Sequence, residues 1–271
     1  MSIIVISRGS YTHGREVAEK VAKALNYEII SREKLIESAA KEFNVPEIKL
    51  LQAKENAPSF LERITYGKER YIAEIESGLL TLLKKDNVIY HGFAGHFFVR
   101  DIPCILKVRI IADIKERVKL VMERDNVSEE EALRIIKKLD EERSKWSRHL
   151  YGIDIADPLL YNLVIQINQI TVDDAVDIIC HAVISLDSFK TTSECLKTIE
   201  NRAIAAKIRA LLIPIKPDIE VTYDQGIAYI KTTLPIQLDE QAFTNKIKEA
   251  CANIPEVKEV KFEIFPLIPI E

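Results

Sequence analysis

The segment SIIVISRGSYTHGREVAEKVAKAL, residues 2–25, contains the pattern of a strand, a polar loop and a helix. Residues 2–7 form an apolar, β-branched run of the kind found in strands that are buried on both faces of a parallel sheet. From Gly14 onward, apolar residues recur at helical spacing with Glu and Lys opposite them, and Asn26 is a typical helix end. The segment therefore predicts a buried first strand that leads directly into an amphipathic helix.

The same alternation of strands and helices continues along the chain. Two further helix starts are marked by capping pairs, because Asp113 stands three residues before Glu116, and Ser128 stands three residues before Glu131. Strands separated by helices favour an α/β fold with a parallel sheet that is covered on both sides. The remaining strands are predicted at residues 27–31, 87–92, 105–112 and 162–168, with a further helix at about 171–186.

Two insertions are longer than a simple crossover between strands requires. Residues 32–84 are mostly helical in pattern, and residues 113–160 are dense in Arg, Lys, Asp and Glu. In an open α/β sheet, ligands bind beyond the carboxyl ends of the strands. Long helical insertions at that edge are therefore expected to act as substrate covers or lids.

The character of the sequence changes after a polar stretch at residues 187–194. A helix is predicted at about 195–212, and residues 219–233 alternate as two strands about an Asp-Gln-Gly turn. A further helix and a final alternating strand complete the chain. The sequence thus predicts an α/β domain over residues 1–190 and a small α+β (αββαβ) module over residues 195–271.

The loop after the first strand fits G-x-x-x-x-G-R-E, one step from the phosphate-binding loop G-x-x-x-x-G-K-[ST]. Its backbone N–H groups and the positive end of the helix dipole would cradle the phosphates of a nucleotide. Arg15 takes the place of the lysine, and the Glu16 carboxylate either binds magnesium differently from a hydroxyl or repels the phosphates. The alternative is an ordinary turn between a strand and a helix. The candidate cofactor-binding residues are Gly9, Ser10, Tyr11, Thr12, His13, Gly14, Arg15 and Glu16.

Several segments resemble the cytidylate kinase-like family of P-loop nucleoside monophosphate kinases. The segment SIIVISRGSYTHGREVAEKVAKALNYEIISREKLI is similar to the family's first strand, glycine-rich loop and first helix. The run LKVRIIADIKERVKLVMERDNVSEEEALRIIKKLDEERSKWSRHLYGID, followed by DPLLYNLVIQIN and ITVDDAVDII, is similar to its fourth strand, arginine-rich lid and last strand. The resemblance covers about residues 1–187.

This resemblance implies a P-loop NTPase fold, with a parallel sheet flanked by helices and a helical lid. It also implies phosphoryl transfer from ATP, with Mg²⁺, to a nucleoside monophosphate, for which CMP or dCMP is the expected acceptor. Asp140 is expected either to orient Arg143 or to touch the acceptor base. An Arg- and Glu-rich helix is also a common solvated face, which is the alternative for this segment. The candidate catalytic residues are Arg15, Arg117, Arg124, Asp140, Arg143 and Arg148.

The loop departs from the family at Tyr11, Thr12 and His13, where Gly-Ser-Gly is usual. Side chains at these positions, with their preference for negative φ, hinder close approach of the backbone to phosphate. The alternative function is therefore a catalytically weak or inactive nucleotide-binding regulatory protein that is derived from such a kinase.

Other polar residues are weaker candidates, and no metal site is assigned. Three histidines at the presumed carboxyl edge of the sheet have either an acid/base or metal role or a purely local capping role: His13, His91 and His96. Three basic residues of the first insertion either meet the acceptor phosphate or line a solvated helical face: Arg63, Lys68 and Arg70.

The C-terminal module resembles the BON domain, a small module that is associated with binding membranes or other ligands. The resemblance rests on the αββαβ order and on the segments VTYDQGIAYIKTTL and IPEVKEVKFEI. It implies contact with a ligand, a protein or a membrane surface.

Composition narrows the class of protein further. The 271 residues carry a net charge of −4, so no overall positive field favours nucleic acid as a partner. No apolar run approaches the roughly 18 residues of a membrane span, and the N-terminus lacks the basic region of a signal peptide. The four cysteines show no zinc-site spacing and are expected to be buried, reduced thiols in a cytoplasmic protein, with a disulfide or metal role as the alternative.

Overall fold

The computed structural model describes residues 1–45, 67–92 and 94–267 of the chain. The chain divides into two compact units, of which the first comprises Met1–Leu35 and Leu82–Leu196 and the second comprises Ile36–Thr81 and Lys197–Glu271. The chain enters the second unit for the last time after Leu196, close to the domain boundary that the sequence predicts near residues 190–195. Much of the first helical insertion also belongs to the second unit, and the predicted domain limits stay a prediction.

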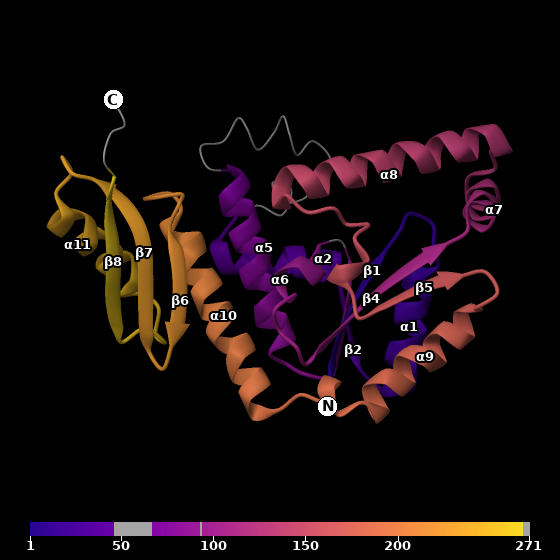
Figure 1. The fold of residues 1–271 in the computed structure, drawn as a ribbon, viewed down its shortest axis with the longest axis horizontal. Helices are drawn as coiled ribbons and strands as arrows, with labels where there is room; N and C mark the ends of the chain where they lie inside the picture. Colours follow the sequence, from indigo (N-terminus) through magenta and orange to yellow (C-terminus); the bar gives the residue numbers. More distant parts are fainter. Residues whose placement is uncertain (46–66, 93, 268–271) are drawn as a thin grey trace. The chain divides into compact units, whose positions relative to one another are not determined.

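The first unit is built on a five-stranded parallel sheet with the order β2-β3-β1-β4-β5 (Figure 1). All neighbouring strands run parallel, and β1 lies in the centre between β3 and β4. The predicted parallel α/β sheet is therefore confirmed. The strands are β1 (Ile3–Arg8), β2 (Glu28–Ser31), β3 (Val88–His91), β4 (Ile105–Ala112) and β5 (Leu163–Ile167).

Two helices, α1 (Gly14–Leu25) and α9 (Val172–Ser185), pack side by side over one face of this sheet (Figure 1). Their apolar stripes meet every second residue of the central strands in one core, in which Val17 and Ile179 are fully buried. Burial of a large apolar side chain contributes roughly 1.5–3 kcal/mol. This packing fixes the N-terminus of α1 at the carboxyl end of β1.

After β4, which points toward α7 in Figure 1, the chain forms a helical hairpin that we call the lid, α7 (Ile114–Asp125) and α8 (Glu129–Tyr151). Both predicted helix starts are confirmed. The carboxylate of Asp113 accepts from the amide of Lys115 at 2.8 Å, and the hydroxyl of Ser128 accepts from the amide of Glu131 at 3.3 Å. The lid helices share an apolar core of their own.

The first unit also contains α6 (Gly95–Phe98) and two short 3-10 turns, η1 (Pro158–Leu160) and η2 (Asp187–Phe189). The helices α2 (Arg32–Phe43) and α10 (Ser193–Leu212) each begin in the first unit and continue into the second. Throughout the described residues, no helix is both long and apolar enough to cross a membrane.

The second unit contains α5 (Gly67–Leu83) up to Thr81, and a three-stranded sheet with the order β6-β7-β8. The strands β6 (Glu220–Asp224) and β7 (Ile227–Pro235) pair antiparallel, and β8 (Glu259–Leu267) pairs parallel with β7. Apolar residues of α10 and of α11 (Glu240–Cys251) pack with the sheet in one core. The predicted αββαβ order is confirmed.

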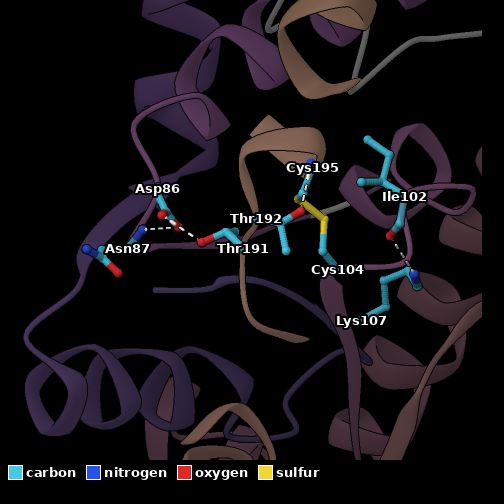
Figure 2. The surroundings of a disulfide bond; sticks show 8 residues. All are labelled: Asp86, Asn87, Ile102, Cys104, Lys107, Thr191, Thr192 and Cys195. Atoms are coloured by element: carbon cyan, nitrogen blue, oxygen red, sulfur yellow. Dashed lines mark hydrogen bonds between the residues drawn. A yellow bond between two sulfur atoms is a disulfide. The ribbon is translucent and has the colours of Figure 1, made fainter. Parts of the chain in front are cut away.

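Cys104 and Cys195 form a disulfide bond, so the expectation that all the cysteines are reduced is wrong (Figure 2). The bond joins the residue before β4 to the first turn of α10, and the two cysteines lie 91 positions apart in the sequence. Because no local spacing marks such a distant pair, the sequence alone does not reveal it. Cys180 and Cys251 are free thiols, and burial raises the pKa of Cys251 to about 11.

Hydrogen bonds near the disulfide also hold the start of α10 (Figure 2). The hydroxyl of Thr191 donates to the carboxylate of Asp86 at 2.7 Å, and the hydroxyl of Thr192 accepts from the amide of Cys195 at 3.1 Å. Thr192 thus caps the start of α10 beside the disulfide. The disulfide and these bonds together fasten the start of α10 to the sheet of the first unit.

Replacing a disulfide cysteine, as in Cys104→Ser, is expected to lower the free energy of unfolding by about 4–5 kcal/mol. The chain-entropy account predicts this loss because the crosslink closes a loop of about 91 residues in the unfolded chain. Urea unfolding of the oxidised proteins measures it. The matched control Cys180→Ser removes a free thiol and keeps the difference between oxidised and reduced protein. Equal midpoints for oxidised wild type and Cys104→Ser would contradict this role.

Candidate functional site

The loop between β1 and α1 is anchored to β4. The amide of Gly9 donates to the carbonyl of Ile110 at 3.0 Å, and the buried hydroxyl of Thr12 donates to the same carbonyl at 3.1 Å. An added Cβ at Gly14 would lie 2.6 Å from Cβ of Arg8, and one at Gly9 would lie 2.8 Å from Cγ2 of Thr12. Both glycines of the motif are therefore required by close packing.

The backbone amides of the loop and of the first turn of α1 are available to a ligand. His13 precedes the helix with φ 58°, and its side chain makes no capping hydrogen bond. Among the described residues, none accepts a hydrogen bond from the amides of residues 10–13. The amides of residues 14–16 have no partner within the helix, because the first turn of a helix has no preceding carbonyl. A run of unpaired donors at a helix N-terminus binds anions such as phosphate.

Three arginines bring positive charge to this loop. Arg143 of α8 donates to the carbonyl of Arg8 at 3.0 Å. Burial, and then the charge of Arg8, lower the pKa of Arg143 to about 10, while burial and the charge of Arg15 lower the pKa of Arg8. All of these guanidinium groups remain charged at neutral pH. Because like charges meet here with reduced hydration, the loop attracts an anion.

The lid reaches the loop through Ser10, Arg117 and Asp140. Nε of Arg117 donates to the carbonyl of Ser10 at 2.9 Å, and Nη2 of Arg117 donates to the carboxylate of Asp140 at 2.6 Å. The hydroxyl of Ser10 donates to the other oxygen of Asp140 and accepts from Arg117. Asp140 thus links Arg117 to the loop, and its predicted roles toward Arg143 and an acceptor base stay predictions.

The remaining catalytic candidates lie on exposed surfaces of this unit. Arg15 points along α1 and pairs with Glu19 at 2.7 Å. Arg148, at the end of α8, pairs with Asp154 at 2.8 Å. Arg124 of α7 pairs with its neighbour in the sequence and also contacts Tyr11 of the loop. These three side chains have exchangeable surface partners in the absence of a ligand.

The Glu16 carboxylate lies at the mouth of the loop, 3.2 Å from Nδ1 of His13 and 3.3 Å from Nζ of Lys20. His91 ends β3, and burial followed by the charges of Arg8 and Arg15 lowers its pKa. Within residues 1–45, 67–92 and 94–267, no group of His, Cys, Asp and Glu is arranged to hold a metal ion. The geometry therefore does not support a shared metal role for the histidines.

Of the three basic candidates in the first insertion, Arg63 lies outside the described residues. Lys68 and Arg70 lie in the first turn of α5, in the second unit, and Nε of Arg70 donates to the carboxylate of Glu74 at 2.8 Å. Their predicted contact with an acceptor phosphate stays a prediction.

A buried polar network that the sequence reasoning missed joins β4, α6 and the chain before β5. The hydroxyl of Tyr161 accepts from Arg109 at 3.0 Å, lies 2.9 Å from Nε2 of His96, and donates to the carbonyl of Ile155 at 2.9 Å. His96 is fully buried, and burial followed by the charge of Arg109 lowers its pKa to about 3.

The sequence contains a signal for Arg109 and Arg8, two residues that the sequence reasoning missed: each is a charged residue in an apolar strand. Arg109 interrupts the otherwise largely apolar strand β4, and Arg8 ends the apolar strand β1 directly before the loop. A charged residue inside such a strand needs a polar partner, because an isolated buried charge is costly. No comparable signal marks Tyr161, whose place in the network depends on tertiary packing.

Because the pKa of His96 is lowered in the folded protein, this network is expected to make the free energy of unfolding depend on pH. The folded pKa of about 3 lies below the ordinary value of 6.5, so between these pH values the unfolded chain binds a proton that the folded protein excludes. The free energy of unfolding is expected to fall on acidification below pH 6.5, with His96 contributing about 2 kcal/mol by pH 5.

Urea unfolding at pH 5 and pH 7 measures this dependence. His96→Gln is expected to flatten it, whereas the control His181→Gln, at an exposed position of α9, leaves it unchanged. A pH dependence in His96→Gln that equals that of the wild type would show that His96 is not the source.

Known proteins with similar sequences share the segment that contains the loop, the sheet and the lid. A sequence profile of the cytidylate kinase-like family matches residues 3–169, which include the loop, the sheet and the lid. The cytidylate kinase of Sulfolobus acidocaldarius is 28% identical over 178 residues, covering 65% of this chain and 91% of its own. The cytidylate kinase of Pyrobaculum islandicum is 26% identical over 193 residues, covering 70% of this chain and 97% of its own.

Among solved structures, an uncharacterized protein from Eubacterium ventriosum aligns with a TM-score of 0.54 and 24% identity, covering 68% of this chain and 99% of its own. At this identity the alignment shows a shared fold. The predicted P-loop kinase fold is confirmed by the family match together with the sheet order. The match spans well over half of the sequence, and the chain belongs to the cytidylate kinase-like family.

Proposed function

We propose that this protein transfers a phosphoryl group from ATP to a nucleoside monophosphate, with CMP or dCMP as the acceptor. Family membership supports nucleoside monophosphate kinase chemistry. The choice of acceptor follows the similarity to cytidylate kinases. Phosphoryl transfer depends mainly on positioning and on neutralising phosphate charge, which are the properties that this site offers.

The observation that carries the proposal is the run of unpaired amides over residues 10–16 beside Arg8 and Arg143. Backbone donors that are fixed by the packing of Gly9, Thr12 and Gly14 need no rearrangement when phosphate arrives. The two arginines neutralise charge that amides alone cannot. A polyphosphate chain satisfies both sets of groups at once.

The residues at the loop also fit Mg²⁺ bound with ATP. A carboxylate oxygen is a ligand that Mg²⁺ accepts, and the Glu16 carboxylate has only surface partners, His13 and Lys20, among the described residues. Glu16 would hold the ion from the side of the loop in place of the usual hydroxyl. When bound, Mg²⁺ neutralises charge on the transferring phosphates.

In this proposal the lid arginines bind the phosphates of the nucleotide. Arg143 already lies against the loop backbone, whereas Arg117 exchanges the carboxylate of Asp140 for a phosphate oxygen. Arg124 and Arg148 of the lid, and Arg15 of α1, would leave exposed ion pairs that solvent screening keeps weak. The planar guanidinium fork suits the oxygens of phosphate.

The second candidate function is that of a nucleotide-binding regulatory protein with weak or no turnover. The contacts of Arg117 with Asp140 and Ser10 favour it, because the lid groups already have partners in the loop. A site in which these contacts outlast nucleotide binding would hold ATP without transferring its phosphate.

We further propose that the C-terminal module is BON-like and binds a ligand, with contact to a protein or membrane surface as the alternatives, and that the protein is cytoplasmic. A pocket of about 230 Å³ in the second unit supports the choice of a ligand. Arg202 and Arg209 of α10 line it together with Glu76 of α5, and burial raises the pKa of the Glu76 carboxyl. The two arginines favour an anionic ligand.

A coupled assay of ADP release with Mg-ATP and each of CMP, dCMP, UMP, AMP and GMP tests the function, together with calorimetric titration of ATP. Turnover with CMP or dCMP is expected. Turnover with only another acceptor would overturn the choice of acceptor. ATP binding without turnover would establish the regulatory function in place of the kinase, and absence of ATP binding would contradict both functions.

Arg143→Ala is expected to lower kcat/KM by about 100-fold or more, because it removes a buried charge beside the loop. Arg143→Lys restores part of the rate, since the charge returns without the planar fork. The matched control is Arg134→Ala, on the same helix, where the ion-pair partners of the arginine among the described residues are Glu130 and Glu131. Equal losses in Arg134→Ala and Arg143→Ala would contradict a specific role for Arg143.

A further inference from the structure

Tyr11 lies in the loop between β1 and α1, and its partly buried side chain packs against the lid. The ring contacts the apolar core of the lid, in which each of the buried side chains is at most 7% exposed. This core consists of Val118 and Val121 from α7 and of Ala132 and Ile136 from α8. A loop residue therefore forms part of the packing that holds the two lid helices together.

Tyr11 makes a second, polar contact with the lid through Arg124. Nη2 of Arg124 donates to the hydroxyl of Tyr11 at 2.9 Å, and the guanidinium carbon lies 4.6 Å from the centre of the ring. The carboxylate of Asp125 pairs with the same guanidinium at 2.6 Å. The ring is thus held by apolar packing, a hydrogen bond and a cation–π contact.

The backbone of Tyr11 is in the left-handed region, with φ 53°. This conformation is unfavourable for a residue with a side chain and persists only where surrounding contacts enforce it. Glycine would adopt it at no steric cost. The contacts of the ring with the lid compensate for the backbone conformation, so the shape of the loop and the position of the lid depend on the same residue.

The neighbouring residue Ser10 is attached to the lid as well, through Arg117 and Asp140. These polar bonds surround the amides that would bind phosphate, and a bound anion competes with them for Arg117. The Tyr11 ring makes its contacts outside this polar cluster. It can therefore remain in the lid while Arg117 changes partner.

We propose that Tyr11 is a positioning residue that couples the lid to the phosphate loop, so that occupation of the loop by a nucleotide polyphosphate is transmitted to α7 and α8. The inference rests on the proposed function for the identity of the ligand. The coupling itself is a property of the unliganded protein and can be measured without turnover.

Hydrogen exchange of lid amides in residues 114–151 tests the coupling in the full-length protein. Tyr11→Gly keeps the loop conformation accessible but removes the ring, and is expected to speed lid exchange about tenfold. Tyr11→Ala, which retains a Cβ, is expected to show the same loss of protection, whereas Tyr11→Phe keeps the packing and stays within about threefold of the wild type. Residues 172–185 of α9, which pack on α1, serve as the internal reference.

The same experiment with AMP-PNP and Mg²⁺ measures transmission from the loop. The ligand is expected to slow lid exchange in the wild type and in the control Arg134→Ala, and to slow it much less in Tyr11→Gly. In active protein, Tyr11→Gly is expected to raise the KM for ATP about tenfold and to change the KM for CMP less than about threefold. A purely structural defect would lower kcat without this split.

Lid exchange within twofold of the wild type in both Tyr11→Gly and Tyr11→Ala would overturn the proposal, even if the wild type phosphorylates CMP. If the wild type binds no nucleotide, the proposed function and the transmission of nucleotide binding both fail, whereas faster lid exchange in the Tyr11 variants still shows that the ring couples the loop to the lid. Should Tyr11→Gly fail to fold, Arg124→Ala replaces it, with an expected increase in lid exchange of about threefold. No increase in Arg124→Ala would then count against the coupling.

Discussion

The first residue of α1 packs so closely on the last residue of β1 that an added Cβ at Gly14 would lie 2.6 Å from that of Arg8. The rest of the site depends on this approach. It places the start of the helix at the carboxyl end of the central strand, with the first amides unpaired. The bonds of Gly9 and Thr12 to Ile110 then tie the loop to β4, the strand that leads into the lid.

Positive charge is concentrated beside this loop, and the repulsion between the arginines there opposes folding. Arg8 and Arg143 lie together in a partly buried setting, and the pKa of each is lowered chiefly by burial. Asp140 compensates for Arg117 on the lid side. A bound polyphosphate would relieve the repulsion and use the free amides, so the fold stores a preference for an anion before any ligand arrives.

The loop holds two residues with side chains in a conformation that glycine adopts more readily. Tyr11 and His13 both have positive φ, which their side chains disfavour. Thr12 between them is anchored by its hydroxyl, and Tyr11 is anchored by its ring in the lid core. Side-chain contacts therefore stabilise a loop conformation that the intrinsic preference of these residues disfavours. The packing of Tyr11 thereby connects the loop to the lid, and lids are elements that close over substrate in many enzymes.

The sequence by itself determined the order and type of the elements, the parallel sheet, the caps at Asp113 and Ser128, and the place of the loop, because hydrophobic periodicity, capping pairs and glycine spacing are local signals. Only the tertiary structure decided that Cys104 bonds Cys195, that Tyr161 joins Arg109 and His96, and that Tyr11 packs against the lid core. These contacts join residues far apart in the chain. Their partners are chosen by the packing of whole helices and strands, and no local pattern records that choice.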